Sequence, residues 1–462
     1  MTEENLGNPG NLNVEELSIT AHSGSKFSLV DPTANMLSEL NIYEDMWNKF
    51  MTGSVIVKDS TNLITKAPIM GGELITIKLR TPTMDDHPNR VINKTFMIYS
   101  IENRTLNSDR EQTYVLNFCS VEMVMDASFI LQQRFEGNTE DIIKKIFEDY
   151  TIEARNPAEQ DHSNVLVVGD TPHSSKVSFI ANNWTPTQTF DYMSKYIKGA
   201  SGTGADFVFF ESNKRMYYTS IQALIKSQRD VMFDEYVYAI KGLDLPRRSV
   251  GEYSSDALPN GWVTIDNMSI PRTIDIIDGQ MTGYYAQTVR AYDLFTKERL
   301  EAKLDIREDF DKFEHTEPGI PIPEGTVRNP YSMTTMKVLN SANNLTQSYN
   351  IPGSKGGNGD NENVIGAQLL RDNYLNSLRD YKFEIDVPGR TDIEVGKMIY
   401  ISYPAPVSKT EDLEYDELFD KQLSGKYLIT GIRHKIDTVG YVMKMEIVKN
   451  GLPESMGPPE EK

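Results

Sequence analysis

Residues 427–435 read YLITGIRHK, and residues 96–104 read FMIYSIENR. Both stretches place an aromatic residue, two apolar residues, a small residue and an isoleucine in the same order before a polar run. Apolar and polar residues that alternate in this way are typical of a half-buried β-strand. One such match arises easily by chance, so its meaning depends on whether the neighbouring segments also match in the same order.

The segments on either side of this match do repeat in order. GGELITIKL (71–79) precedes the first copy and VGKMIYISY (395–403) precedes the second, while YVLNFCSV (114–121) and YVMKMEIV (441–448) follow them. Consecutive strands that recur in one order predict two similar antiparallel β-domains in one chain. The alternative is that any two antiparallel meanders in a β-rich chain look alike.

A further match places Met-Thr-Gly before an expected strand in both FMTGSVIVKDSTNLIT (50–65) and QMTGYYAQTVRAYDLFT (280–296). It predicts that the second β-domain is split by an inserted segment. The predicted organisation is a polar N-terminal arm (1–16), a first tube-like β-barrel domain (17–122), a mixed α/β domain (123–230), a second tube-like β-barrel domain (231–300 and 381–452), an inserted segment with a loop and a helix (301–380), and a flexible tail (453–462). The predicted fold class is therefore α+β, mainly β.

The predicted mixed domain contains two marked helices. EGNTEDIIKKIFEDY (136–150) has apolar residues at helical spacing after a possible cap at Asn138. WTPTQTFDYMSKYIKGA (184–200) begins with Thr185, which Gln188 can complete as a capping box. A hairpin is expected to follow, turning at Ser212–Asn213.

Composition narrows the class of protein. The chain has 462 residues, a formal net charge of −20 and one cysteine, Cys119. No apolar run has the length of a membrane span and the N-terminus has no signal pattern, so we expect a protein without membrane insertion. No concentrated basic stripe is present, which argues against tight wrapping of nucleic acid. The densest charge run is the acidic segment 409–421, expected as a loop between two strands.

No catalytic, metal-binding or cofactor-binding site is predicted. The six histidines show no metal-ligand spacing, and no nucleophile elbow, phosphate loop or dinucleotide fingerprint occurs. Cys119 lies in a strand-like run, where a packed residue is expected rather than a nucleophile. Trp47 and Trp184 are likewise expected to pack, Trp47 within a helix-like EDMWNKF.

Three longer stretches resemble baseplate central hub proteins of contractile-tailed, T-even-like bacteriophages. Residues 30–77 resemble the start of these proteins, residues 425–452 resemble their last tube-forming strands, and WTPTQTFDYMSKYI (184–197) resembles the mixed domain between. The resemblance covers most of residues 17–452 and consists of patterns of strands and turns. The insertion at 301–380 and the acidic loop match no feature of the family.

The resemblance implies a structural protein of the virion tail, assembled in the host cytoplasm. In that family each chain carries two tube-like β-barrels, and a homotrimer forms a ring of pseudo-sixfold symmetry between the hexameric tail tube and the trimeric central spike. The implied partners are the spike and tube proteins, with baseplate wedge and tape-measure proteins as further candidates, and DNA passes through the lumen without specific binding. No lytic residue, metal or cofactor is implied.

Two other functions remain open at this stage. A tail-associated cell-wall glycosidase requires two carboxylates that face each other across a cleft. A carbohydrate-binding protein for host adhesion requires exposed aromatic rings in a groove, for which Trp47, Trp184 and Trp262 are the tryptophan candidates.

Overall fold

The computed structural model is mainly β with largely antiparallel sheets, as the sequence predicts. It describes residues 9–31, 34–82, 91–152, 166–169, 176–195, 199, 206–229, 235–238, 260–294, 297, 299–322, 326, 329, 333–339, 345–346, 360–379, 381–406 and 418–453. None of the helices in these ranges is both long and apolar enough to cross a bilayer.

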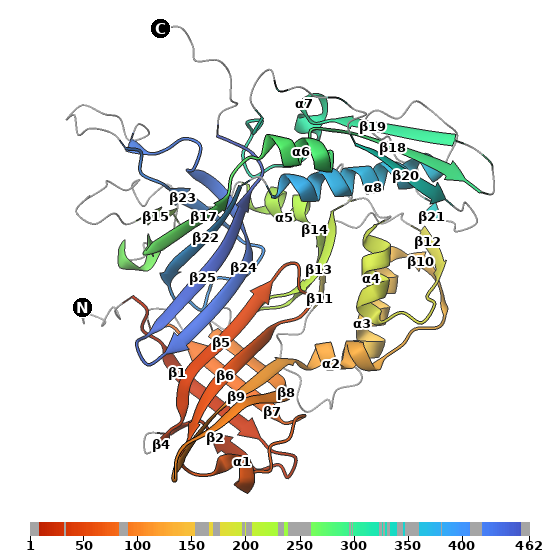
Figure 1. The fold of residues 1–462 in the computed structure, drawn as a ribbon. Helices are drawn as coiled ribbons and strands as arrows, with labels where there is room; N and C mark the ends of the chain where they lie inside the picture. Colours follow the sequence, from red (N-terminus) through yellow and green to blue (C-terminus); the bar gives the residue numbers. More distant parts are fainter. Residues whose placement is uncertain are drawn as a thin grey trace, which may run out of the picture.

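Most strands belong to one large sheet (Figure 1). Its members are β1 (Asn13–Thr20), β2 (Lys26–Ser28), β5 (Leu37–Asp45), β6 (Thr52–Asp59), β7 (Leu74–Arg80), β8 (Val91–Ser108), β9 (Glu111–Ser120), β15 (Glu235–Tyr238), β16 (Thr264–Ile265), β17 (Asn267–Arg272), β22 (Tyr381–Pro388), β23 (Met398–Ser402), β24 (Gly425–Asp437) and β25 (Tyr441–Lys449). The main path runs β16-β15-β23-β24-β5-β6-β9-β8-β7-β1-β2, and β25, β22 and β17 branch from β24.

The N-terminal half of this sheet is a Greek key with the strand order β6-β9-β8-β7, flanked by β5 and β1. The alternation read from the sequence is confirmed in β7, where Ile75, Ile77 and Leu79 are buried. These side chains pack into one core with residues of the facing strands, such as Leu116 and Phe118 of β9.

The C-terminal half has the same strand order, β22-β25-β24-β23, with β17 beside β22. Ile399 and Ile401 of β23 are buried like Ile75 and Ile77 of β7. The pairing of β23 with β24 has the register expected from the sequence match, because Ile399 lies opposite Tyr427 and Ile75 lies opposite Phe96.

Two backbone details occur at matching places in both halves. Gly72 and Gly396 have φ angles of 90° and 88°, which favour glycine, and their amides donate to the carbonyls of Ile98 (2.7 Å) and Ile429 (2.9 Å). The residue after each isoleucine is the extra residue of a β-bulge against β9 or β25. The regular strand pairing is therefore interrupted at matching positions in the two halves.

The register corrects one part of the sequence match. Counted from the bulges, Asn117 of β9 corresponds to Glu446 of β25, because they lie opposite Ser100 and Gly431. Tyr114 therefore corresponds to Met443 and not to Tyr441. A shift of two residues keeps the same face of a strand, so the alternating pattern alone did not detect it.

The two halves are joined edge to edge by β5 and β24. β5 pairs with β6 on one side and with the C-terminal part of β24 on the other, with Arg433 opposite Tyr43 and Lys435 opposite Asn41. The strands of both halves thus form one continuous sheet.

Closed barrels were expected, and among the described residues the hydrogen-bonded path is open. It ends at β2 on one side and at β16 and β17 on the others. β16 and β17 follow each other in the chain but pair with β15 and β22 at opposite ends of the C-terminal half. The two open ends of the C-terminal half are therefore connected by the chain between β16 and β17 and not by strand pairing.

Helices and short strands between residues 121 and 228 lie beside the large sheet, and we call them the mixed domain (Figure 1). Many of their buried side chains form a second core, whereas Phe210, Ile221 and Ile225 pack into the core of the large sheet. The elements of the mixed domain are α2 (Val121–Ser128), β10 (Arg134–Asn138), α3 (Thr139–Phe147), a π-helical turn (Glu148–Ile152), β11 (Leu166–Val168), β12 (Lys176–Ile180), α4 (Pro186–Ser194), β13 (Phe207–Glu211), β14 (Met216–Ser220) and α5 (Ile221–Gln228). The capping box of Thr185 and Gln188 is confirmed, as is the hairpin of β13 and β14. Asn138 caps α3 by position, without a side-chain hydrogen bond to the helix backbone.

The Met-Thr-Gly match proves wrong. β6 belongs to the large sheet, but β18 (Ala286–Asp293) pairs with β19 (Arg299–Asp305) and β20 (Thr334–Leu339) in a separate sheet. The strand that takes the place of β6 in the C-terminal half is β22.

A helix covers the separate sheet. α8 (Asp360–Ser377) packs on β18 and β19, with Leu370 and Tyr374 in the same core as Val289 and Leu304. The remaining elements are β3 (Val30–Asp31), β4 (Ala34–Asn35), α1 (Leu63–Lys66), a 3₁₀ turn (Asn260–Val263), α6 (Ile276–Thr282), α7 (Ile306–Asp309), a second 3₁₀ turn (Phe310–Lys312) and β21 (Leu345–Thr346). The acidic segment 409–421 connects β23 to β24, as predicted, although most of it lies outside the described residues.

Candidate functional site

One face of eight neighbouring strands, from β17 through β22, β25, β24, β5, β6 and β9 to β8, carries mostly polar side chains. We call it the polar face. Its residues, read from the cross-strand registers, are Glu39, Asn41, Tyr43, Asp45, Thr52, Ser54, Ile56, Lys58, Ser100, Glu102, Thr105, Thr113, Val115, Asn117, Cys119, Asn267, Ser269, Lys382, Glu384, Asp386, Gly431, Arg433, Lys435, Asp437, Val442, Lys444 and Glu446. The opposite face of these strands is the buried core, except at the exposed end of β8 from Glu102 to Ser108.

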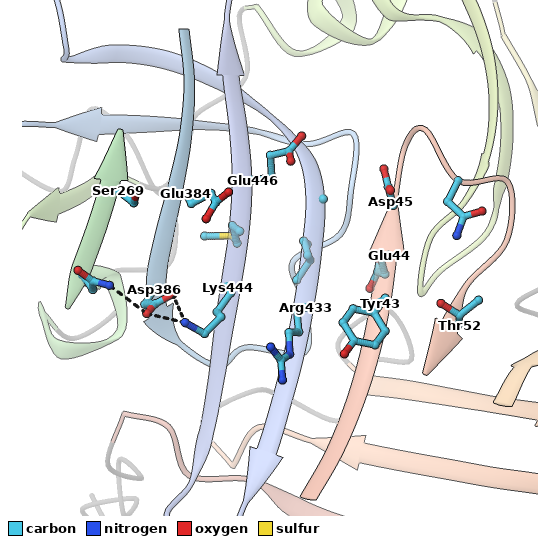
Figure 2. A pocket seen from close by; sticks show the side chains of 15 residues that line it. Tyr43, Glu44, Asp45, Thr52, Ser269, Glu384, Asp386, Arg433, Lys444 and Glu446 are labelled. Atoms are coloured by element: carbon cyan, nitrogen blue, oxygen red, sulfur yellow. Dashed lines mark hydrogen bonds and ion pairs between the residues drawn. The ribbon is translucent and has the colours of Figure 1, made fainter. Parts of the chain in front are cut away.

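A groove of about 480 Å³ lies on the C-terminal part of the polar face (Figure 2). Lys444 and Arg433 line it, with Lys444 Nζ 2.9 Å from an oxygen of Asp386 and the Arg433 guanidinium 5.8 Å from the centre of the Tyr43 ring. Lys382 Nζ lies 2.6 Å from Glu446 Oε2. The cations of this part of the face are thus neighbours of carboxylates and of an aromatic ring, and both signs of charge are interleaved.

Asp45 lies at the end of the same groove. Burial raises the pKa of its carboxyl, and the nearby carboxylate of Glu446 adds to the rise. Its Oδ1 accepts a hydrogen bond from the amide of Trp47 at 2.8 Å. This carboxylate therefore stabilises the turn that leads from β5 into β6.

The N-terminal part of the polar face is nearly neutral. Asn117 Nδ2 donates to Ser100 Oγ at 2.9 Å, and Thr52, Ser54 and Thr113 occupy the neighbouring positions. Such a surface offers hydroxyl and amide groups but no cluster of cations, so it gives phosphate groups no strong electrostatic anchor.

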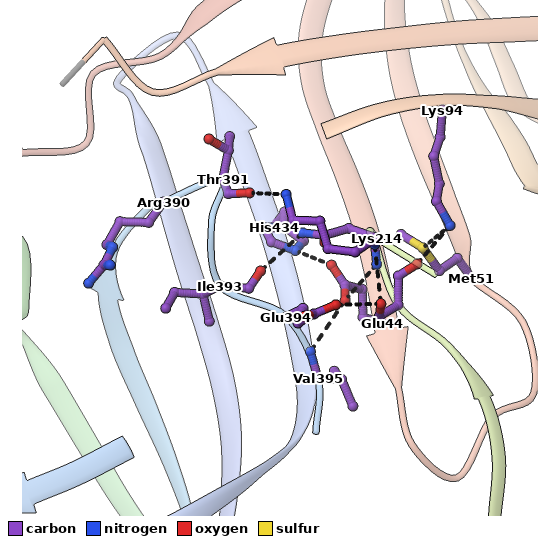
Figure 3. A network of polar contacts seen from close by, with 12 residues as sticks. Glu44, Met51, Lys94, Lys214, Arg390, Thr391, Ile393, Glu394, Val395 and His434 are labelled. Carbon is purple, nitrogen blue, oxygen red and sulfur yellow. Dashed lines mark hydrogen bonds and ion pairs between the residues drawn. The ribbon is translucent and has the colours of Figure 1, made fainter. Parts of the chain in front are cut away.

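Beneath the junction of β5 and β24 lies a buried polar network (Figure 3). His434 Nε2 is 2.8 Å from Glu44 Oε1, and its Nδ1 is 2.7 Å from the Tyr441 hydroxyl. Tyr441 in turn donates to the carbonyl of Arg390 at 3.0 Å. His434 thus connects Glu44 to Tyr441 through its two ring nitrogens.

Glu44 connects this network to two other parts of the chain. Its Oε2 accepts from the amides of Asn213 (3.1 Å) and Val395 (3.4 Å). Asn213 is in the β13–β14 turn of the mixed domain, and Val395 precedes β23. One carboxylate therefore holds the N-terminal half, the C-terminal half and the mixed domain together.

A buried ion pair fixes the mixed domain to β8. Lys94 Nζ lies 2.6 Å from Glu211 Oε1 and donates to the Ser212 carbonyl at 2.7 Å. Glu211 also accepts from the Ser120 hydroxyl and, at 2.9 Å, from the Met51 amide. The side chains of Lys94 and Glu211 are only 4% and 1% exposed, so separating them leaves an unpaired charge in the interior.

Lys214 completes the network. Its ammonium donates to the carbonyls of Thr391 (2.9 Å) and Val91 (3.3 Å), and burial lowers its pKa to about 8. Ser212 Oγ donates to Glu394 Oε2 at 2.7 Å. Together these contacts form a largely buried polar layer at the junction.

The histidines noted in the sequence are not brought together. His434 lies in the buried network, whereas His22 is exposed, with Nε2 3.2 Å from the Gly71 carbonyl. His315 is buried against Phe310, and burial lowers its pKa to about 4. His87, His162 and His173 lie outside the described residues.

Cys119 is a packed strand residue, as predicted. It is buried on β9, and burial raises the pKa of its thiol to about 11, with further contributions from the charges of Glu211 and Glu122. Such a thiol stays protonated at neutral pH and is a poor nucleophile.

The tryptophans do not form a common surface. The prediction for Trp47 is wrong, because it lies in the turn between β5 and β6 and is 47% exposed. Trp184 packs on Tyr192, with ring centres 4.7 Å apart, and Trp262 is fully buried. Among the residues that the structure describes, no three His, Cys, Asp or Glu side chains are placed to hold a metal ion.

The polar face and the network beneath it were not predicted as a unit. Glu44 and His434 lie far apart in the sequence, and neither forms a motif with its neighbours. The one available signal was the matching strand pattern, which predicts two similar sheets but not how they join.

No protein-family model matches the sequence, and no curated protein matches it. The fold is similar to two solved structures over nearly the whole length of all the chains. For the 43 kDa tail protein of prophage MuSo2 from Shewanella oneidensis the TM-score is 0.53 at 8% identity, covering 95% of this chain and 99% of the other. For the tail protein from Neisseria meningitidis MC58 the TM-score is 0.50 at 10% identity, again covering 95% and 99%.

Proposed function

We propose that this chain is a structural hub of a phage-type tail, in which a ring of three copies joins a sixfold tube to a threefold spike. The likeness to two tail proteins, over nearly the full length of the chains, supports a tail component. At 8% and 10% identity this likeness supports the fold alone. The proposed role as a hub rests on the internal geometry of the chain.

The observation that carries the proposal is the repeated order of strands. β5-β6-β9-β8-β7 and β17-β22-β25-β24-β23 follow the same path, with a matching glycine and a matching bulge in each. We take this as an internal duplication. Chance resemblance of two meanders does not account for a left-handed glycine and a bulge at the same register positions.

A duplicated chain suits an adaptor between two symmetries. A closed ring binds only partners whose contact surfaces repeat at compatible angles. Three copies of a chain with two similar halves present three identical surfaces to a trimeric partner and six similar surfaces to a hexameric one. Among the described residues the separate sheet of β18, β19 and β20 has no second copy, so we assign it to the threefold set.

In this arrangement the polar face lines the bore through which DNA passes. The buried opposite face cannot do so, because it forms the core. The polar face carries a small excess of carboxylates over cations, and many of its charges are paired with each other. Free passage of DNA therefore depends on the lack of a basic stripe among the described residues of this face more than on strong repulsion by an acidic wall.

The proposed partners follow from the same geometry. A spike protein takes the threefold end and a tube protein the sixfold end, while wedge and tape-measure proteins are further candidates for the outer surface and the bore. Assembly takes place in the host cytoplasm, and the final location is the tail baseplate of the virion.

A non-enzymatic role agrees with the character of the groove. Asp386 and Glu446 line it with Lys444 and Lys382 as their respective neighbours, and Asp45 caps a turn. Retaining and inverting glycosidases instead keep one acid and one base available to the sugar.

The mass of the purified protein tests this proposal. Light scattering after size exclusion is expected to give a trimer at high concentration, and class averages from electron microscopy are expected to show a ring with six similar lobes. A stable dimer with twofold symmetry would refute the ring.

A further inference from the structure

The junction between the two halves shows how a strand is added to β24. β23 covers only the first part of one edge of β24, and β5 covers the rest. The Met46 amide donates to the Thr430 carbonyl at 2.8 Å, and the register then runs from Gly431 opposite Asp45 to Asp437 opposite Glu39. Two of its pairs serve as the template, Arg433 with Tyr43 and Lys435 with Asn41.

The corresponding edge of β8 pairs with no described strand beyond Ile98. On the β7 side, the last hydrogen bonds reach Ile98, just as those on the β23 side reach Ile429. From Tyr99 to the end of β8, β9 lies on one side, and no other described strand lies on the opposite side. Leu106, on this bare part, is 72% exposed.

The strand that corresponds to β5 also has a bare edge. β17 pairs with β22 as β5 pairs with β6, and no described strand pairs with its other edge. Met268 and Ile270 of β17 pack against the core, which fixes the strand in place. The chain therefore has a second strand of the β5 kind, β17, and a second strand of the β24 kind, β8, and these two strands lie at separate edges.

These two edges are also matched in register. β8 has one extra residue between Glu102 and Thr105, and β17 has one extra residue between Ser269 and Arg272. Each strand thus has its extra residue between the two positions that correspond to the pairs of the β5–β24 junction, so both pairs can form in one register. The pair of Arg433 with Tyr43 corresponds to Glu102 opposite Arg272, and the pair of Lys435 with Asn41 corresponds to Thr105 opposite Ser269.

We infer that β17 of one copy pairs antiparallel with the C-terminal part of β8 of a second copy, in the register of β5 on β24. This inference rests on the proposed function and specifies the contact that closes the ring. An acidic and a basic residue, Glu102 and Arg272, stand directly opposite each other, which stabilises this register. The added strand also reduces the exposure of Leu106 and pairs with backbone groups that no described strand contacts.

The contact is head to tail, because each copy offers β17 to one neighbour and β8 to the other. Contacts of this kind build a ring when the rotation per copy closes and a filament when it does not. The β5–β24 junction sets the rotation between the two halves of one chain. The proposed β17–β8 junction applies a similar rotation between chains, so the two together make up the rotation per copy.

Disulfide trapping tests the pairing. Thr105→Cys chains are mixed with Ser269→Cys chains and oxidised with copper phenanthroline, and a covalent dimer is expected on a non-reducing gel. The double variant is expected to give covalent species up to the trimer. Cys119 does not interfere, because its buried thiol has a pKa raised to about 11.

Two pairs serve as controls. Lys435→Cys with Asn41→Cys in one chain reproduces the internal template and is expected to form a disulfide within the monomer. Thr105→Cys mixed with Lys26→Cys joins β8 to β2, the other bare end of the main path, and is expected to give no dimer.

A charge exchange gives a second readout that does not depend on oxidation. Glu102→Arg and Arg272→Glu each place like charges opposite one another and are expected to weaken association about fivefold per junction, while the double variant restores it. Sedimentation equilibrium measures both effects.

The outcomes separate the contact from the ring. A trimer whose 105/269 variants form no disulfide overturns this inference and leaves the proposed function standing. A protein that neither associates nor forms the disulfide overturns both. A 105/269 dimer without the 105/26 dimer, together with restoration by the charge exchange, supports the pairing.

Discussion

Replacing Lys94 with methionine is expected to destabilise the protein far more than the same replacement at Lys78. Both lysines lie on adjacent strands of the same sheet, since Lys94 is opposite Ile77. Lys94 pairs with Glu211 in the interior, at 4% and 1% side-chain exposure, whereas Lys78 pairs with Glu15 at 42% and 27%.

The two magnitudes follow from this difference in burial. Removing Lys94 leaves the Glu211 carboxylate without its cation, although Met51 and Ser120 still donate to it. Breaking a buried pair in this way costs about 3–5 kcal/mol. The exposed pair of Lys78 contributes less than about 1 kcal/mol, because water and salt screen it.

Guanidinium unfolding followed by tryptophan fluorescence measures both variants, and the first transition is the one to compare because a chain with several cores need not unfold in one step. Lys94→Met combined with Glu211→Gln is expected to recover much of the loss, since the glutamine is neutral and its oxygen still accepts from Met51. If the costs of Lys94→Met and Lys78→Met differ by less than about 1 kcal/mol, the buried pair does not hold the mixed domain to β8.

Three further outcomes are expected. Gly53→Ala places a Cβ 2.3 Å from the Phe118 ring and is expected to cost about 1–3 kcal/mol through overpacking, measured by thermal unfolding. Burial lowers the pKa of the Lys449 ammonium to about 7 from 10.5, so between these values the unfolded chain binds more protons and stability rises with pH. Lys449→Met is expected to lose that rise in unfolding experiments from pH 7 to 10. Thr185→Ala removes the oxygen that accepts from the Gln188 amide and is expected to cost about 1 kcal/mol, read from the melting of the mixed domain.

The sequence predicts those parts of the fold that depend on local patterns. The alternation of Ile75, Ile77 and Leu79, the capping box at Thr185 and the β13–β14 hairpin each involve neighbouring residues, and all three are confirmed. The match of residues 71–79 and 96–104 with 395–403 and 427–435 is reproduced in the strand registers, because bulges and glycines fix it.

Predictions that depended on longer-range pairing were less accurate. Met-Thr-Gly before a strand carries no information about the sheet that the strand joins, so the match wrongly made β18 the counterpart of β6. A shift of two residues left Tyr114 aligned with Tyr441. Closure of a barrel depends on whether the two end strands meet, which no local pattern records.

The candidate site was the part that the sequence predicted least well. Glu44, His434 and Asn213 come from three separate regions, and each looks like an ordinary polar residue in its own strand or turn. Only the fold brings them within hydrogen-bond distance.

The carboxylate of Glu44 has a mechanical consequence. Glu44 contacts His434, Asn213 and Val395 at the same time, and these contacts restrict the angle between the two halves of the molecule. In a closed assembly that angle determines how many subunits complete the circle. Loosening this one side chain, by Glu44→Ala, should therefore broaden the curvature and yield arcs and spirals alongside complete circles.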